Sequence, residues 1–349
     1  MEQMTFQQKL KKYLSEEMIR LNAIKERDTI LSVPPCHFYV EPTNVCNHDC
    51  IMCVPKEQRG QPGFMDISMW KKIVDNMASH EIMSPVTLIG RGEPLLHKDI
   101  VSIVDYGSRH NIPCYIITNG SLLDEKMTKS LLDAGVKKIQ VSIHAHSSKS
   151  HEFITKKKNY EEIKKNVLRM TEIIKENGYR CHTSVMSCIC EANKHEINDF
   201  IGYWNSKVDR CFVTELYSMQ GDSSLAKESM TAAQKYMKNK KHPGCTVPFF
   251  FLSIRWHGSI NPCGYDWGED MVVGNANDVD FDIMKVFNNE SMQNLRKCMF
   301  TSDFSFCKKY NYPCETCEWP FDPDAFRGLD DHVNNFPELF SRNFSGALK

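Results

Sequence analysis

The stretch Cys46-Asn-His-Asp-Cys50-Ile-Met-Cys53 places three cysteines in a C-x3-C-x2-C pattern, directly after an apolar run that is predicted to be the first β-strand. In a parallel α/β sheet, such a loop lies at the carboxyl edge, where ligands bind. Three closely spaced thiolates can hold three irons of a cubane and leave the fourth iron open. The pattern therefore favours an iron–sulfur cluster with one open coordination position.

Zinc is the alternative metal for this stretch, because a structural zinc site normally has four protein ligands. His48 could in principle be the fourth ligand. A histidine between two cysteine ligands more often faces solvent, so we expect His48 to be exposed and we favour the iron–sulfur interpretation.

Beyond this stretch, extended apolar runs alternate with helical stretches, which is the pattern of βα units and a parallel sheet. Asp66 is predicted to cap a helix through Met77, and a second helix spans Tyr160 to Asn177 before a stop at Gly178. Right-handed crossovers would stack the helices outside the sheet. Because eight strands close a barrel, six indicate an α/β fold with a partial (β/α)6 barrel. The predicted strands are His37 to Glu41, Val86 to Ile89, Cys114 to Thr118, Lys137 to Ile143, Cys181 to Ile189 and Arg210 to Leu216.

Two flanking regions differ from the alternating part. Residues 5 to 27 have the pattern of an amphipathic helix, and we expect its apolar positions to pack against the fold. After about residue 240 the cysteine density rises, and a hairpin is predicted from Phe249–Arg255 and Ser259–Pro262. We therefore expect a helical extension (1–35), a partial barrel (36–235) and a small cysteine-rich domain (236–349). The apolar positions of the first helix are Phe6, Leu10, Leu14, Met18 and Leu21.

The composition restricts the partners and the compartment. Fifteen cysteines, an odd number in a chain that shows no export signal, favour reduced thiols that are free to bind metal over a disulfide framework. The formal net charge of −1 provides no general attraction for nucleic acid or an anionic membrane. No apolar run reaches the roughly 20 residues of a membrane helix. We therefore expect a cytoplasmic protein that binds neither nucleic acid nor membranes.

The segment from Glu41 to Cys53 resembles the cluster loop of the radical S-adenosylmethionine (radical SAM) superfamily. Three further motifs follow in the expected order, each at the end of a predicted strand. Gly90-Arg-Gly-Glu-Pro94 resembles the GGEP motif, Ile117-Thr-Asn-Gly120 the TNG turn, and Val141-Ser-Ile143 the strand whose serine faces SAM. The resemblance covers about residues 36 to 220. It implies a [4Fe–4S] cluster on Cys46, Cys50 and Cys53, with SAM bound at the open iron.

The resemblance also implies which residues bind SAM and what reduces the cluster. The family's pattern departs here in two places: His144 stands where an aspartate is common, and a downstream arginine for the SAM carboxylate is not evident. Lys156 could replace that arginine, although the run from Lys156 to Lys158 could equally be a solvated approach to a helix. A flavodoxin or ferredoxin would serve as electron donor. The implied SAM-binding residues are Gly90, Gly92, Glu93, Pro94, Asn119, Ser142 and Lys156.

A second set of cysteines lies in the carboxyl-terminal region. Cys245 is followed by twelve residues, Gly258, four residues and Cys263, and later by Cys314-Glu-Thr-Cys317. This spacing resembles the SPASM and shorter twitch extensions found behind radical SAM domains, which implies an auxiliary [4Fe–4S] cluster ligated by these four cysteines. A four-cysteine zinc knuckle is the alternative.

The number of auxiliary clusters depends on two further cysteines, Cys298 and Cys307. Their spacing does not match the C-x2-C-x5-C-x3-C block of the full SPASM domain. We therefore favour the one-cluster twitch form over two auxiliary clusters.

The reaction class follows from the resemblance, and the substrate does not. Radical SAM enzymes cleave SAM reductively to a 5′-deoxyadenosyl radical, which takes a hydrogen from the substrate. Members with these extensions oxidise, dehydrate or epimerise sugars and aminocyclitols, or modify ribosomally made peptides. Peptide-modifying members often carry a recognition domain ahead of the barrel, for which about 35 residues leave little room. We favour a small carbohydrate- or aminocyclitol-like substrate. The alternatives are a peptide maturase and a non-catalytic iron–sulfur protein.

Substrate contacts are expected where the last strands of the barrel end. The candidates are Cys188 and Cys190 after the fifth strand, and Glu215 and Tyr217 after the sixth. Either cysteine could return a hydrogen atom to the substrate, because the S–H bond of a thiol is weak. Core packing or surface placement would explain each of the four residues equally well.

Overall fold

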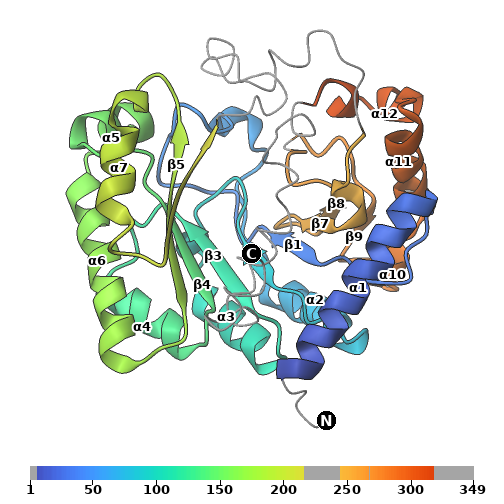
Figure 1. Ribbon diagram of the computed structural model, residues 1–349, viewed down its shortest axis with the longest axis horizontal. Coiled ribbons are helices and arrows are strands. Elements are labelled where there is room, and N and C mark those ends of the chain that lie inside the picture. The colour runs from blue at the N-terminus through green and yellow to red at the C-terminus, as the bar shows by residue number, and fades with distance from the viewer. Residues whose placement is uncertain (1–5, 216–243, 267, 318–349) are drawn as a thin grey trace, which may run out of the picture.

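The computed structural model describes residues 6–215, 244–266 and 268–317 (Figure 1). Its strands form one nine-stranded sheet in the order β6-β5-β4-β3-β2-β1-β7-β8-β9. Strands β1 to β6 are parallel, and the six strands predicted for a partial barrel are confirmed to within one residue at each end. They are β1 (His37–Val40), β2 (Val86–Leu88), β3 (Cys114–Thr118), β4 (Lys138–Ser142), β5 (His182–Ile189) and β6 (Arg210–Glu215).

Helices follow the strands and cover one face of the sheet, as Figure 1 shows for α4, α6 and α7 outside β4 and β5. Asp66 accepts a hydrogen bond from the backbone of Ser68 and caps α2, and the left-handed Gly178 ends α6, as predicted. The helices around the six strands are α2 (Ile67–Ser79), α3 (Ile100–Arg109), α4 (Glu125–Asp133), α5 (Ser148–Thr155), α6 (Tyr160–Asn177) and α7 (Ile197–Trp204).

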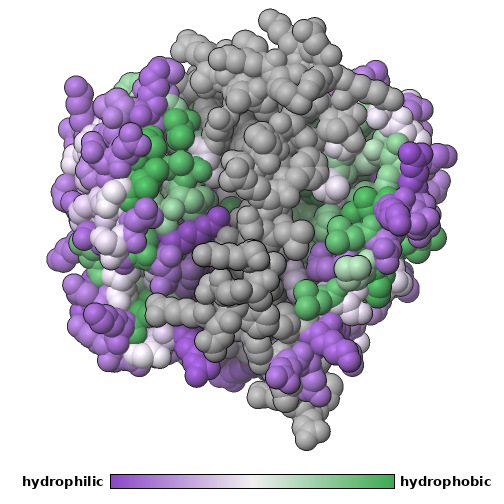
Figure 2. Space-filling model, in the orientation of Figure 1, coloured by the Kyte–Doolittle hydropathy of each residue, from purple (hydrophilic) through white to green (hydrophobic). Residues whose placement is uncertain are grey.

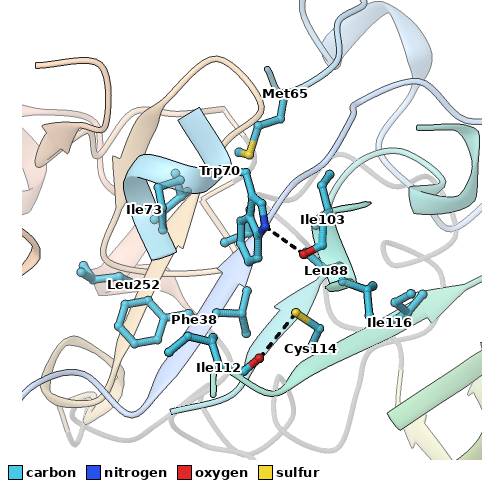
Figure 3. Close-up of a cluster of buried hydrophobic side chains, with 14 of the residues drawn as sticks. Phe38, Met65, Trp70, Ile73, Leu88, Ile103, Ile112, Cys114, Ile116 and Leu252 are labelled. Atoms are coloured by element: carbon cyan, nitrogen blue, oxygen red, sulfur yellow. Dashed lines mark hydrogen bonds between the residues drawn. The ribbon is translucent and has the colours of Figure 1, made fainter. Parts of the chain in front are cut away.

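The main core lies between the sheet and these helices (Figure 3). Trp70 of α2 is fully buried, and its indole N–H donates to the carbonyl of Ile103 in α3 at 2.9 Å. Alternate strand residues such as Phe38 and Leu88 point into the same core. Each buried side chain of this size contributes about 1.5–3 kcal/mol. The residues between them, including Tyr39, therefore occupy the opposite face of the sheet.

The carboxyl-terminal region extends the same sheet. β7 (Phe251–Ile254) pairs parallel with β1, and β8 (Ser259–Asn261) and β9 (Gly274–Asn275) continue antiparallel, so the predicted hairpin is confirmed. α10 (Ile283–Phe287), α11 (Glu290–Thr301) and α12 (Ser305–Lys309) follow. The domain boundary predicted at residue 236 lies outside the described residues.

The first helix, α1 (Phe6–Glu26), packs through a different face from the predicted one. Leu14, Met18 and Leu21 are 50%, 59% and 45% exposed, whereas Arg20 and Ala23 are buried. The Arg20 guanidinium donates to Glu17 and to the carbonyl of Pro34, so its charge is satisfied inside the contact. The prediction that the apolar stripe packs inward is therefore wrong for Leu14, Met18 and Leu21, while the side chains of Phe6 and Leu10 lie outside the described part of the chain. At the right of the view in Figure 2, where α1 lies, hydrophobic residues are visible among hydrophilic ones.

Within the described residues, no helix combines the length and the apolar character that crossing a membrane requires.

Candidate functional site

The three cysteines of the first motif lie in the cluster loop (residues 41–53), which leaves the carboxyl end of β1. The backbone N–H of Cys53 donates to the carbonyl of Cys50 at 3.0 Å, which closes a tight turn. Burial raises the pKa of Cys46, Cys50 and Cys53, and the charges of Cys53 and Cys46 raise that of Cys50 further. The three thiols therefore lie within electrostatic reach of one another in a partly buried site.

Arg59 supplies positive charge to this site. Its Nε donates to the carbonyl of Val54 at 2.8 Å and its Nη2 lies 3.6 Å from the sulfur of Cys53, while the buried Nη1 has no hydrogen-bond partner among the described residues. The guanidinium lowers the pKa of all three thiols, opposing burial. A cation beside three thiolates offsets their combined charge. This donor set fits a cluster held by three thiolates.

The arrangement of possible metal ligands also bears on the choice of metal. In the described part of the chain, no three or more His, Cys, Asp and Glu side chains converge closely enough to hold a single metal ion. An iron–sulfur cubane does not require such convergence, because each thiolate binds a separate iron.

His48 is buried, with 2% of its surface exposed, so the prediction that it faces solvent is wrong. Its Nε2 accepts a hydrogen bond from the Asn159 amide at 3.2 Å, and the amide oxygen of Asn159 pairs with His151 at 3.0 Å. Burial lowers the pKa of His48 to about 4. Backbone hydrogen bonds attach the cluster loop to the end of α5, so the His48 imidazole is packed between the loop and this helix. Its hydrogen bond goes to Asn159 and not to the thiols.

The predicted SAM loop (residues 90–94) packs directly on the cluster loop. A Cβ atom on Gly90 would lie 2.3 Å from the side chain of Glu41, and one on Gly92 would lie 2.3 Å from the carbonyl oxygen of Thr43. The backbone N–H of Glu93 donates to the carbonyl of Val45 at 2.8 Å. Only glycine permits the close approach of Gly90 to the Glu41 side chain and of Gly92 to the backbone of the cluster loop.

Glu93 links the second and third motifs through its buried carboxylate. Oε1 accepts hydrogen bonds from the Leu95 backbone at 3.0 Å and the Thr118 hydroxyl at 2.7 Å, and Oε2 accepts from the Asn119 backbone at 2.7 Å. A carboxylate has about four acceptor positions, so about one remains for an ammonium group. Besides burial, the charge of Glu93 raises the pKa of Cys46, which places this carboxylate beside the thiols.

The other predicted SAM-binding residues surround the same edge of the sheet. Pro94 begins the 3-10 turn Pro94–Leu96. The Asn119 amide is engaged with Asn47 of the cluster loop at 2.8 Å and with Ser121. Ser142 ends β4, is half-buried, and its hydroxyl makes no hydrogen bond to the described residues. Lys156 is exposed at the end of α5, and its ammonium lies 4.6 Å from the Phe153 ring centroid.

Cys188 and Cys190 are both buried, but only Cys188 packs beside the cluster loop, against Met52. The backbone N–H of Cys188 donates to Nδ1 of His144 at 3.1 Å. Burial lowers the pKa of His144 to about 4, so it is neutral and carries its proton on Nε2. Its left-handed φ of 61° is strained for a histidine, as is common at functional sites.

Of the two candidates at the end of β6, only the backbone of Glu215 belongs to the described part of the chain. The backbone of Glu215 pairs with Ile189 of β5 at the end of the strand. Tyr217 lies outside the described residues.

The four predicted auxiliary ligands lie close together. Burial raises the pKa of Cys245, and the charges of Cys317 and Cys263 raise it further. The Cys314 thiol is hydrogen-bonded to Cys307, and the charges of Cys263 and Cys245 also raise its pKa. Segments more than 50 residues apart in the chain thus bring these thiols into one half-buried site.

Tyr265 was not identified from the sequence. Its backbone N–H donates to the Cys263 sulfur at 3.3 Å. Burial raises the pKa of its phenol, and nearby Tyr39, Cys263, Cys317 and Cys188 raise it further. The phenol is therefore within electrostatic reach of both the auxiliary thiols and Cys188. No local sequence pattern distinguishes this tyrosine. Its position two residues after the predicted ligand Cys263 is the one sequence feature that could have indicated a place near the auxiliary thiols.

Comparisons with known proteins agree with this geometry. Residues 40–203 match the radical SAM superfamily, and residues 245–318 match SPASM, an iron–sulfur cluster-binding domain. The AdoMet-dependent heme synthase of Methanosarcina barkeri is 31% identical over 113 residues, which is 32% of either protein. The S-adenosyl-L-methionine-dependent 2-deoxy-scyllo-inosamine dehydrogenase of Niallia circulans is 22% identical over 74% of this chain and 85% of that protein.

Among solved structures, SuiB of Streptococcus suis bound to its precursor peptide SuiA aligns with a TM-score of 0.60 and 15% identity. That alignment covers 80% of this chain and 70% of SuiB, and at this identity it supports the fold alone.

Proposed function

We propose that this chain, which belongs to the radical SAM superfamily, oxidises a small hydroxyl-rich substrate. Because it also carries an iron–sulfur cluster-binding SPASM domain, its cofactors are SAM and [4Fe–4S] clusters. When bound, the cluster and SAM would supply a 5′-deoxyadenosyl radical that removes a hydrogen atom from the substrate. The protein itself binds, orients and shields the reactants.

The observation that carries this proposal is the close packing of the SAM loop on the cluster loop. Cys46, Cys50 and Cys53 would hold the cluster, and Arg59 would offset its charge. Glu93 has about one acceptor position left for the SAM amino group. The free hydroxyl of Ser142 at the end of β4 could contact another part of SAM.

Two observations support a hydroxyl-rich substrate. The Niallia circulans dehydrogenase acts on an aminocyclitol, and its alignment covers most of both chains. The inner face of the sheet also carries polar side chains: Gln140 of β4 and Ser184 of β5 pair there, and the buried hydroxyl of Ser184 has no hydrogen-bond partner among the described residues. Polar groups of this kind suit hydrogen bonding to hydroxyls better than burial of an apolar ligand.

The auxiliary site would accept the electron that the substrate radical releases when, with loss of a proton to solvent, it becomes the oxidised product. Cys245, Cys263, Cys314 and Cys317 would ligate that cluster completely, so it has no open iron for substrate. Tyr265 is within electrostatic reach of these thiols and of Cys188, and its ring would contact the substrate. A flavodoxin- or ferredoxin-type protein would reduce the first cluster.

Iron content and SAM cleavage test the proposal. Anaerobically reconstituted protein should bind about eight irons, and a triple Cys46/Cys50/Cys53→Ala variant about four. Dithionite-reduced protein should release 5′-deoxyadenosine and methionine from SAM, and Cys50→Ala should abolish this release. Bound zinc at the carboxyl-terminal cysteines would refute the auxiliary cluster. No cleavage with any reductant would favour a non-catalytic iron–sulfur protein.

The substrate class needs a separate assay, in which aminocyclitols, sugars and short peptides are compared as stimulants of 5′-deoxyadenosine formation in D2O. Deuterium-free 5′-deoxyadenosine together with an oxidised aminocyclitol or sugar is expected. Turnover of a peptide alone would favour the maturase alternative.

A further inference from the structure

A buried group of charges joins the SAM loop to the auxiliary loop (residues 263–266 and 268–271), which carries Cys263. Arg91 donates to Glu41 from its backbone N–H at 2.8 Å, from Nε at 3.0 Å and from Nη2 at 2.9 Å. The same Nη2 lies 2.8 Å from Oε1 of Glu269. The side chains of Arg91 and Glu41 are 3% and 1% exposed and that of Glu269 is 18% exposed, so the first ion pair is shielded from solvent and the second is partly shielded. One guanidinium thus contacts both loops.

Glu269 is itself held from the other side. Its Oε2 accepts hydrogen bonds from the Ser259 hydroxyl at 2.6 Å and from Nε2 of His257 at 2.9 Å. Burial alone would raise the pKa of Glu269, but these hydrogen bonds and the charge of Arg91 lower it to about 2. Its φ of 58° is left-handed, which is strained for a glutamate and persists only where surrounding contacts enforce it. The carboxylate is therefore charged and fixed in orientation.

A second arginine fixes the remainder of the auxiliary loop. Arg255, at the end of β7, lies 3.8 Å from Glu41 and donates to the carbonyl of Asp266. The Asp266 carboxylate in turn accepts from the backbone N–H groups of Asp270 and Met271, each at 3.0 Å. Arg255 thus links Asp266 to Glu41 at the base of the cluster loop, and Asp266 in turn holds the backbone of Asp270 and Met271.

Arg91 occupies the second position of Gly90-Arg-Gly-Glu-Pro94, where the GGEP pattern has glycine. A glycine there could not contact Glu269, so this chain has a connection that the motif alone does not provide. We propose that Arg91 and Glu269 are positioning residues that couple SAM binding to the placement of the auxiliary loop. The inference rests on the proposed function, because it takes the SAM loop to bind SAM.

The coupling can be measured with SAM itself. Glu269→Gln removes the charge that pairs with Arg91 but preserves size and leaves the Arg91–Glu41 pair intact. Arg169→Gln is the matched control: Arg169 also bridges carboxylates, those of Glu125, Glu172 and Glu176, but on the exposed surface of α6. SAM affinity would be measured by equilibrium dialysis on reconstituted protein, with iron content and melting temperature determined on the same samples.

In Glu269→Gln, SAM affinity is expected to fall about 5- to 150-fold, the usual range of coupling between two sites, while iron content stays near the wild-type value. Arg169→Gln should stay within about twofold of wild type. Coupling is reciprocal, so SAM should also shift the electron paramagnetic resonance spectrum of the reduced auxiliary cluster in the wild type and not in Glu269→Gln. A purely structural ion pair would not produce this difference.

Unchanged SAM affinity in Glu269→Gln would overturn the inference. It would also be overturned if the affinity fell together with iron content or melting temperature, because the pair would then only hold the fold together. If Glu269→Gln does not fold, Arg91→Lys serves instead, since lysine retains the charge but cannot contact both carboxylates in the same geometry. Wild-type protein that assembles clusters but binds no SAM would refute the proposed function, which is a distinct result.

Discussion

Alanine at position 92 would separate the two loops on which the proposed chemistry depends. The added Cβ would lie 2.3 Å from the carbonyl oxygen of Thr43 and 2.5 Å from that of Val45. Ordinary van der Waals contact for such an atom begins at 3.4 Å. Both obstacles are backbone atoms, so no side-chain rotation can relieve the clash. The SAM loop must therefore move away from the cluster loop by about 1 Å.

A misplacement of about 1 Å typically costs about 100-fold in a site that depends on orientation, which corresponds to about 2.7 kcal/mol. We expect Gly92→Ala to weaken SAM binding or slow SAM cleavage by about this factor. The hydrogen bond from Glu93 to Val45 should be lost in the same step, because it spans the same gap. Cluster assembly should persist, since the atoms nearest to the added Cβ belong to residues 43–45 and not to the three cysteines.

Gly202→Ala is the control for this experiment. Gly202 lies on the exposed side of α7 and has no atom within 4 Å of a Cβ placed there. Alanine should stabilise that helix by about 0.5–1 kcal/mol and leave SAM chemistry unchanged. Iron content, SAM affinity by equilibrium dialysis and 5′-deoxyadenosine formation would be compared across the three proteins. Wild-type SAM affinity and cleavage in Gly92→Ala would refute the close packing of these loops.

Three further changes test other parts of the structure. In Glu93→Gln, the new amide N–H2 would face a hydrogen-bond donor whichever carboxylate oxygen it replaces. We therefore expect about 1–3 kcal/mol lower stability in urea unfolding, together with weaker SAM binding. A stability equal to that of the wild type would contradict the hydrogen bonds described. Because the pKa of His144 is lowered to about 4 from its usual 6.5, the unfolded state binds its proton first as the pH falls. Stability should therefore decline from pH 6.5 to 4 by up to about 1.4 kcal/mol per pH unit from this residue, and His144→Asn should reduce that slope. Trp70→Phe should cost about 1–3 kcal/mol, because the Ile103 carbonyl loses its buried donor; a loss below about 0.5 kcal/mol in thermal unfolding would argue against that bond.

Several features were predictable because they depend on residues close together in the chain. Strand β3 was predicted at its observed bounds, and α6 with its stop at Gly178, since periodicity and capping are local properties. The spacing of Cys46, Cys50 and Cys53 likewise placed three thiols in one loop without reference to the remainder of the fold.

The burial of His48 and the packing face of α1 were not predictable in the same way. A histidine between cysteines is exposed unless another segment covers it, and here α5 and Asn159 do so from more than 100 residues away. Leu14, Met18 and Leu21 of α1 remain about half exposed, whereas Arg20 is buried because Glu17 and Pro34 satisfy its guanidinium. Amphipathicity shows that a helix has two faces, but neighbouring segments decide which face is covered.

The sequence by itself determined the alternating α/β architecture, the positions of the thiols along the chain and the order of the motifs, because each of these follows from spacing within a few residues. Only the tertiary structure decided that β7 pairs with β1, that Tyr265 comes within electrostatic reach of Cys188 and the auxiliary thiols, and that Arg91 contacts Glu269. Those contacts join residues that are up to about 200 positions apart. Their geometry depends on how the whole sheet and its loops pack, and no local pattern encodes it.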